Sequence, residues 1–190
     1  MTKRPLKIAI TGTHSTGKST FLDKLESSLK SSGLNVERFG SLALEARKLD
    51  FPILRGHTVD STLWIIGECI RREAVATLRA DVILIDRPVS DALGYLEAAL
   101  EVSGRTVEPQ RLDTVKAIAR GYMHEYDIVI ETILDLKVPL GAGRDADSDL
   151  RAAAGRCINE FAAAYGPTRL QLTAENQSQV LEQVLERIST

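Results

Sequence analysis

One stretch of the 190-residue chain combines glycine, lysine and hydroxyl side chains at a spacing that suits phosphate binding. Residues 12–19 read Gly-Thr-His-Ser-Thr-Gly-Lys-Ser and fit the pattern G-x-x-x-x-G-K-[ST]. In such a loop the backbone N–H groups face an anion, the lysine reaches the β- and γ-phosphates of a nucleoside triphosphate, and the last hydroxyl ligates Mg²⁺. Lys18 and Ser19 take these two positions. We therefore expect ATP and Mg²⁺ as cofactors.

The nucleotide would be held by the whole motif and the residue after it. The residues expected to bind it are Gly12, Thr13, His14, Ser15, Thr16, Gly17, Lys18, Ser19 and Thr20. His14 is expected to contribute its backbone rather than a catalytic side chain. A glycine-rich strand-to-helix turn with an exposed lysine is the alternative interpretation.

A carboxylate and an arginine follow an apolar run at residues 81–86. Asp86 ends this run, at the point where a parallel strand presents residues to the crevice at its carboxyl end. It could hold Mg²⁺ together with Ser19, or accept the proton of an attacking hydroxyl. A helix-capping or loop aspartate is the alternative. Arg87 could bind the phosphate of an acceptor or the phosphoryl group in transfer.

Further charged residues fall at two other places. Glu45 and Arg47 lie beyond the second apolar strand and would suit the polar groups of an acceptor, although spacing alone favours an ordinary solvated helix face. Arg144 and Arg151 lie in and after a Gly- and Asp-rich loop at 135–147. The lids of small phosphotransferases use such arginines to neutralise phosphoryl charge. Surface pairing with the neighbouring aspartates is the alternative.

The elements that must position these residues alternate along the chain. Continuous apolar runs indicate strands that are buried on both faces, and runs with helical spacing lie between them. Strands are predicted at 6–11, 36–39, 81–86, 126–133 and 168–172, and helices at 20–30, 41–48, 60–79, 90–102, from 109, 148–165 and 174–188. This order predicts an α/β fold with three layers and a mainly parallel five-stranded sheet. We expect a single domain over residues 1–190, with a small lid at about 135–152.

Composition excludes several classes of protein. The chain is 44% hydrophobic and 26% charged with a formal net charge of −2, so a disordered chain and a strongly basic nucleic-acid or membrane-surface binder are not expected. The apolar run at 6–10 is interrupted by Lys7 and is too short for a secretory signal, and no stretch could span a bilayer. Cys69 and Cys157 form no CxxC motif. We expect a cytoplasmic protein with two reduced thiols.

The absence of other motifs narrows the nucleotide chemistry. The chain has no Asn-Lys-x-Asp for guanine recognition, which argues against a Ras-like GTPase, and no Leu-Ser-Gly-Gly-Gln, which argues against a transporter ATPase. Two functions from different classes fit what is left. The first is a phosphotransferase that moves the γ-phosphoryl group of ATP to a small molecule. The second is a nucleotide-binding regulatory ATPase that acts on a protein partner.

Four segments, in order, resemble one group of P-loop kinases. They are residues 12–20, Glu45-Ala-Arg47, Asp86-Arg-Pro-Val-Ser-Asp-Ala-Leu-Gly-Tyr95, and 126–130 followed by Arg144 and Arg151. The group contains the nicotinamide riboside kinase domain of bifunctional NAD-synthesis regulators and lies near the thymidylate and deoxynucleoside kinases. The first and third segments are the most specific, and the similarity to the lid is weaker.

The resemblance implies a P-loop NTPase fold, ATP·Mg²⁺ as donor and a nucleoside- or nucleotide-like acceptor, in a monomer or homodimer. Residues with implied catalytic roles are Lys18, Asp86, Arg144 and Arg151. Residues implied to face the acceptor are Glu45, Arg47, Arg87 and Tyr95. Asp86 would act as base or as metal partner, and the two lid arginines would close over the phosphates.

Overall fold

A wholly parallel sheet forms the centre of the molecule. In the computed structural model, residues 4–13, 17–40, 42–133 and 147–189 are described. The five strands of the described sheet lie in the order β2-β3-β1-β4-β5. Their bounds are β1 Leu6–Thr11, β2 Val36–Phe39, β3 Val82–Asp86, β4 Ile128–Thr132 and β5 Thr168–Leu172. All four pairings are parallel, so the sequence-based expectation of an α/β fold with a parallel sheet is confirmed.

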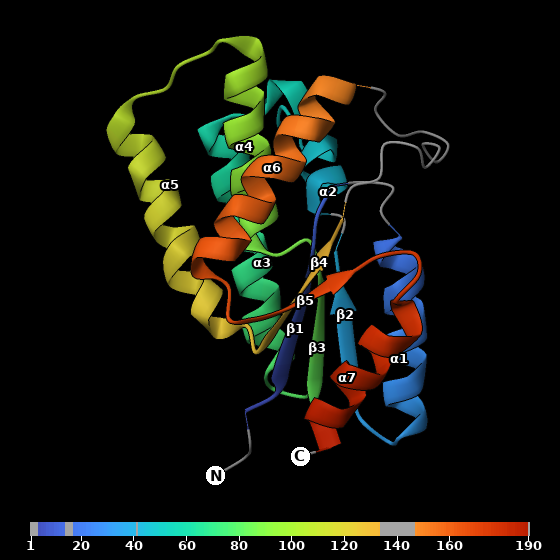
Figure 1. Ribbon diagram of the computed structural model, residues 1–190. Helices are drawn as coiled ribbons and strands as arrows, with labels where there is room; N and C mark the ends of the chain where they lie inside the picture. Colours follow the sequence, from blue (N-terminus) through green and yellow to red (C-terminus); the bar gives the residue numbers. More distant parts are fainter. Residues whose placement is uncertain (1–3, 14–16, 41, 134–146, 190) are drawn as a thin grey trace.

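Helices cover both faces of this sheet (Figure 1). Their bounds are α1 Lys18–Ser31, α2 Leu42–Lys48, α3 Val59–Ala76, α4 Val89–Ser103, α5 Pro109–Tyr122, α6 Ser148–Tyr165 and α7 Gln177–Ser189, with short 3₁₀ turns η1 at Leu54–Gly56 and η2 at Met123–Glu125. Helices α1 and α7 pack on one face, and α3, α4 and α6 cover the other with α2 and α5 beside them. None of the described helices is long and apolar enough to cross a membrane.

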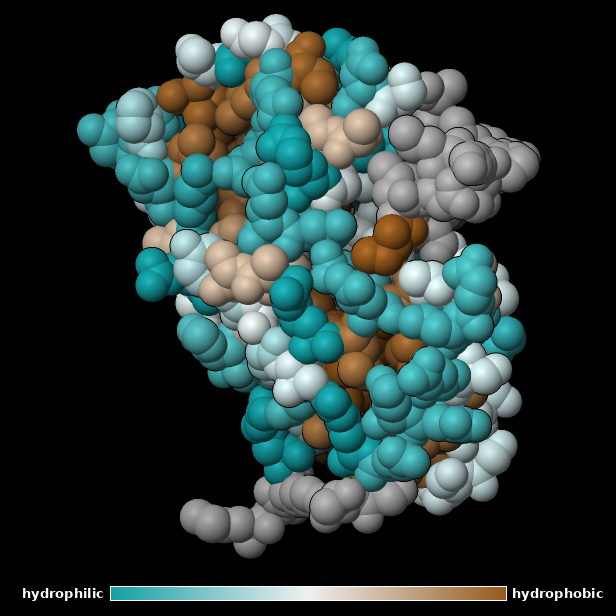
Figure 2. Space-filling view, viewed as in Figure 1, coloured by the Kyte–Doolittle hydropathy of each residue, from teal (hydrophilic) through white to brown (hydrophobic). Residues whose placement is uncertain are grey.

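The apolar runs of the strands are continuous because each face of the sheet has its own core. Ile8 and Ile10 of β1 pack against α1 and α7, whereas Ala9 between them belongs to the core under α3 and α4. Alternate residues of a strand point to opposite faces, so a strand covered on both sides has no polar face. Charged and polar side chains cover much of the outer surface, and apolar side chains show between the elements (Figure 2).

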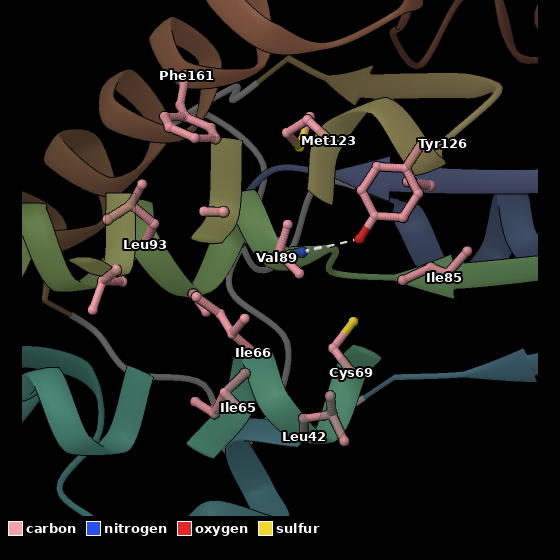
Figure 3. Packing of buried hydrophobic residues seen from close by; sticks show 14 of the residues in the cluster. Leu42, Ile65, Ile66, Cys69, Ile85, Val89, Leu93, Met123, Tyr126 and Phe161 are labelled. Carbon is pink, nitrogen blue, oxygen red and sulfur yellow. Dashed lines mark hydrogen bonds between the residues drawn. The ribbon is translucent and has the colours of Figure 1, made fainter. Parts of the chain in front are cut away.

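A buried polar network lies where the larger core meets the start of α4. The Tyr126 hydroxyl accepts a hydrogen bond from the Val89 backbone N–H at 3.3 Å (Figure 3) and donates one to Glu73 Oε1 at 3.1 Å. Lys7 Nζ lies 3.1 Å from Glu73 Oε2, and both side chains are buried. Because Val89 is the first residue of α4, the network fixes the end of that helix nearest β3.

The main departures from the predicted elements lie at their ends. The last helix begins at Gln177 rather than 174, because the Asn176 side chain accepts a hydrogen bond from the Thr173 N–H at 2.8 Å and makes a turn there. The region 49–59, between two predicted helices, contains η1. Most of the predicted lid, residues 135–146 of about 135–152, lies outside the described residues. The single-domain assignment with a lid therefore stays a prediction.

Candidate functional site

The phosphate-binding motif lies between the end of β1 and the start of α1. Gly17 precedes α1 in the left-handed conformation, with φ 83°. Gly12 has φ 128°, and a Cβ at this position would overlap the Thr132 side chain of β4. The Thr132 hydroxyl donates to the Thr11 carbonyl at 2.9 Å, which draws the two strand ends together. Glycine is therefore required at position 12 by both conformation and space.

Lys18, the lysine of the motif, is buried, with 5% of its surface exposed. Its ammonium donates to the carbonyl of Gly12 at 2.9 Å and to that of Thr13. These contacts hold the positive charge against the backbone of the loop, and the role of Lys18 in phosphate binding stays a prediction. Predicted residues His14, Ser15 and Thr16 lie outside the described part of the chain.

An aspartate that the sequence analysis did not single out fastens the motif to α4. Asp91 accepts hydrogen bonds from the Thr11 hydroxyl and from the Gly12 N–H, the latter at 3.3 Å. Arg87 Nη1 lies 3.6 Å from Asp91 Oδ2 and donates to the Gly12 carbonyl at 3.3 Å. Burial raises the pKa of Asp91 to about 6, although Arg87 and Lys18 oppose the shift. Asp91 belongs to the segment Asp86–Tyr95 that carries the resemblance to kinases, but nothing in the sequence indicated its contact with Gly12.

Arg87 has an unusual backbone conformation directly after β3. Its φ of 73° lies in the left-handed region, and its N–H donates to the Ile10 carbonyl at 3.1 Å. A non-glycine residue in this region costs about 1 kcal/mol or more, and such residues recur at functional sites. The guanidinium lies 5.5 Å from the centre of the Tyr95 ring and 3.5 Å from its hydroxyl. Two residues predicted to face the acceptor, Arg87 and Tyr95, are thus brought together beside Gly12.

Asp86 and Ser19, the predicted metal ligands, line the same pocket. The pocket has a volume of about 340 Å³ and is lined by Ser19, Glu26, Arg38, Phe39, Gly40 and Asp86. Asp86 Oδ1 is buried and has no hydrogen-bond partner among the described residues. A Cβ on Gly40 would lie 2.7 Å from Asp86 Cβ, so glycine lets the end of β2 approach this carboxylate closely. A carboxylate oxygen without a hydrogen-bond partner, in a pocket that a serine also lines, fits a Mg²⁺ ion, for which oxygen ligands are the rule.

The acidic and basic residues of α2 have other surroundings. Glu45 forms an ion pair with Arg72 of α3, and Arg72 also donates to Glu68 at 2.8 Å. Arg47 is exposed. These contacts tie Glu45 to α3 rather than to the phosphate-binding motif, and the acceptor role of both residues stays a prediction.

Only one of the two predicted lid arginines can be placed. Arg144 lies outside the described residues, whereas Arg151 lies in the first turn of α6 and is 5% exposed. Arg151 Nε and Nη2 are buried without a hydrogen-bond partner in the part of the chain that the structure describes. Asp147, the N-cap of α6, is paired with Arg55 at 2.7 Å. The role of Arg151 at the phosphates and the alternative of pairing with nearby aspartates both stay predictions.

His57 is a further buried polar residue that the sequence analysis left without a role. It is 3% exposed, and neither ring nitrogen has a hydrogen-bond partner among the described residues. Its ring stacks on Tyr95, with centroids 6.1 Å apart and planes inclined by 25°. Burial, helped by the Arg105 charge, lowers the pKa of His57 to about 4, so the ring is neutral at pH 7. A lone histidine in a loop carries no sequence signal for this position.

Comparisons with known proteins bear on the family and the fold of the chain. A family model described as an AAA domain matches residues 7–178. The fold resembles a deoxyadenosine kinase from M. mycoides with bound dATP, at a TM-score of 0.69 and 16% identity over 97% of this chain and 100% of that one. It also resembles a NadR protein in complex with NR, at a TM-score of 0.74 and 12% identity over 98% of this chain and 52% of that one. No curated protein matches. The predicted resemblance to this group of kinases is confirmed.

Proposed function

Because the chain belongs to the AAA domain family and has the fold of nucleoside kinases, we propose that it is an ATP- and Mg²⁺-dependent phosphotransferase acting on a nucleoside- or nucleotide-like acceptor. The observation that carries this proposal is the grouping of Lys18, Asp86 and Arg87 around one loop. Each group has a part in phosphoryl transfer, and the similar structures are those of a deoxyadenosine kinase and a NadR protein. Cys69 and Cys157, both buried free thiols, fit the cytoplasmic location that we propose.

In the proposed reaction the acceptor hydroxyl attacks the γ-phosphorus of ATP in line with the leaving oxygen. A bond forms between the acceptor oxygen and phosphorus, the bond from phosphorus to the β,γ-bridging oxygen breaks, and ADP leaves. The acceptor proton passes to Asp86 when that carboxylate serves as the base. Mg²⁺, held by Ser19 and Asp86, would neutralise phosphate charge when bound.

The remaining groups position the reactants and balance charge. Lys18 and the backbone of the loop bind the β- and γ-phosphates, and Arg87 and Arg151 face the phosphoryl group or the acceptor. Such positioning and charge neutralisation supply most of the rate of phosphoryl transfer, because little covalent help is needed. Asp91 contacts both the Gly12 N–H and the Arg87 guanidinium, and so holds the start of the phosphate-binding loop next to Arg87.

The Asp86→Asn substitution tests this assignment. Loss of a base or metal ligand should lower turnover by roughly 10²- to 10⁴-fold, while the affinity for ATP changes little because Lys18 and the loop remain. Asp113→Asn, a change on the exposed surface of α5, is the matched control and should leave both quantities unaltered. Turnover of the Asp86 variant close to that of the Asp113 variant would remove Asp86 from the mechanism.

A further inference from the structure

His57 is held in a fixed position by contacts of its backbone. Arg105 Nη2 donates to the His57 carbonyl at 2.9 Å and to the Arg55 carbonyl at 2.8 Å. On the other side, Thr58 caps α3: its N–H donates to the Ser61 hydroxyl at 2.9 Å, and its hydroxyl accepts from the Ser61 N–H at 3.2 Å. These contacts fix the chain on both sides of the histidine. The ring is therefore well ordered although its own nitrogens have no partner among the described residues.

The backbone immediately before His57 is strained. Leu54, the first residue of η1, has φ 58°, a conformation that side-chain-bearing residues adopt rarely and mostly near binding or catalytic sites. No residue of η1 is buried. Leu54 packs against the core cluster that contains Tyr95, so the strained turn lies beside a residue that is predicted to face the acceptor.

The ring lies among residues that already belong to the proposed acceptor side. It stacks on Tyr95, whose hydroxyl faces Arg87, and Arg87 directly follows Asp86. Leu54 and Leu150 pack around Tyr95. A continuous path of contacts thus leads from the phosphate-binding loop, through Arg87 and Tyr95, to His57.

We propose that His57 is an acceptor-binding residue, which hydrogen-bonds the uncharged end of the acceptor, opposite the hydroxyl that receives the phosphoryl group. This inference rests on the proposed function and extends it to the recognition of the acceptor. A buried polar atom without a partner carries a desolvation cost that a ligand hydrogen bond removes. Two such atoms on one rigid ring make a specific recognition point.

The chemistry of the ring names the kind of group it recognises. A neutral imidazole has one N–H donor and one nitrogen acceptor. It suits a hydroxyl, amide or ring-nitrogen group of a nucleoside, and it offers no charge to a phosphate. The leucine side chains near Tyr95 suit a flat, weakly polar ring. The surroundings of His57 therefore suit the uncharged ring of the acceptor, which a nucleoside and its monophosphate both carry at this end.

The test compares His57→Phe, which keeps an aromatic ring and removes both hydrogen bonds, with His57→Gln, which keeps a donor and an acceptor. His124→Phe, a change at an exposed histidine in η2, is the matched control. The probes are nucleosides, deoxynucleosides, their monophosphates and nicotinamide riboside. For each variant the KM of the acceptor and of ATP are measured by ADP release, and acceptor binding is measured by calorimetry.

We expect His57→Phe to raise the KM of the preferred acceptor about tenfold or more, with the KM of ATP unchanged. His57→Gln should retain part of the affinity, and His124→Phe all of it. Without ligand, His57→Phe should be at least as heat-stable as the wild type, since it removes two unpartnered buried polar atoms; a purely structural histidine would instead lower the melting temperature.

The outcomes separate this inference from the proposed function. Acceptor turnover with the same KM in the wild type and both His57 variants overturns the inference and leaves the proposed function intact. Nucleoside binding that depends on His57 without turnover supports the inference and overturns the proposed function. If no probe binds to the wild-type protein, both are wrong.

Discussion

The buried ion pair between Lys7 and Glu73 gives a quantitative prediction for Lys7→Met. Both side chains are at most 4% exposed, and Glu73 also accepts hydrogen bonds from the hydroxyls of Tyr122 and Tyr126 at 3.0 and 3.1 Å. The variant keeps these hydrogen bonds but leaves a buried carboxylate without its closest cation. Removal of one partner of a buried pair typically costs about 3–5 kcal/mol of the free energy of unfolding. With a urea dependence of about 2 kcal/mol/M, the unfolding midpoint should fall by about 2 M.

The loss should depend on pH in a defined direction. Burial raises the pKa of Glu73 and Lys7 opposes this shift, so removal of Lys7 raises the pKa further. A carboxyl whose pKa is higher in the folded than in the unfolded state favours folding below the unfolded pKa, and this advantage is lost as pH rises through the folded pKa. Relative to the wild type, Lys7→Met should therefore be most destabilised at pH 8 and clearly less so at pH 5.

Urea unfolding of the wild type and variants at pH 5, 7 and 8 checks this reasoning. Lys30→Met, which breaks an exposed pair with Glu26, is the control and should cost at most about 1 kcal/mol. Lys7→Met combined with Glu73→Gln should recover part of the loss, because no unpaired charge is left in the core. The reasoning is refuted if Lys7→Met costs no more than Lys30→Met, or if its cost is the same at all three pH values.

Three further predictions concern the site and its support. Lys18→Ala should weaken ATP binding and turnover together, as measured by calorimetry and ADP release; an unchanged ATP affinity would contradict its role at the phosphates. Asp91→Asn keeps the shape of the side chain but removes the charge beside Arg87. Because burial raises the pKa of Asp91 to about 6, the change of stability near pH 6 should disappear in this variant. Thermal unfolding from pH 4 to 8 measures this. Gly94→Val should lower the melting temperature strongly, because even a Cβ at position 94 of α4 overlaps the Ile158 side chain of α6. A destabilisation of about 1 kcal/mol lowers the melting temperature by only about 2–4 °C. A loss no larger than that would mean that α4 and α6 separate easily.

Elements with strong local patterns were predictable from the sequence. Strands β2 and β5 have the predicted bounds although they contain charged and polar residues, and α6 has the predicted bounds Ser148–Tyr165. Strands β1 and β3 lie where apolar runs place them, to within a residue. Their signal is local, since burial on both faces removes the polar positions from a strand. The end of α7 nearest β5 was placed three residues early, because the Asn176 side chain competes with the helix for the backbone there.

The motif itself was predictable, but the contacts that support it were not. The spacing of Gly12, Lys18 and Ser19 is a local signal, whereas the link from Asp91 to Gly12 joins residues 79 positions apart. The same limit applies to Glu45, whose pairing with Arg72 depends on how α2 lies against α3. Spacing identifies residues that can do chemistry, and tertiary contacts decide which of them meet.

The central claim is the transfer of phosphoryl groups to a small acceptor, and one measurement tests it most directly. The purified protein is incubated with Mg·ATP and, one at a time, with nucleosides, deoxynucleosides, their monophosphates and nicotinamide riboside, and both ADP and phosphorylated acceptor are quantified. The account predicts that at least one acceptor raises ADP release far above the rate with ATP alone, with one phosphorylated acceptor formed per ADP. If ATP binds but its hydrolysis is the same with every acceptor and no acceptor is phosphorylated, the account is contradicted and a regulatory ATPase takes its place.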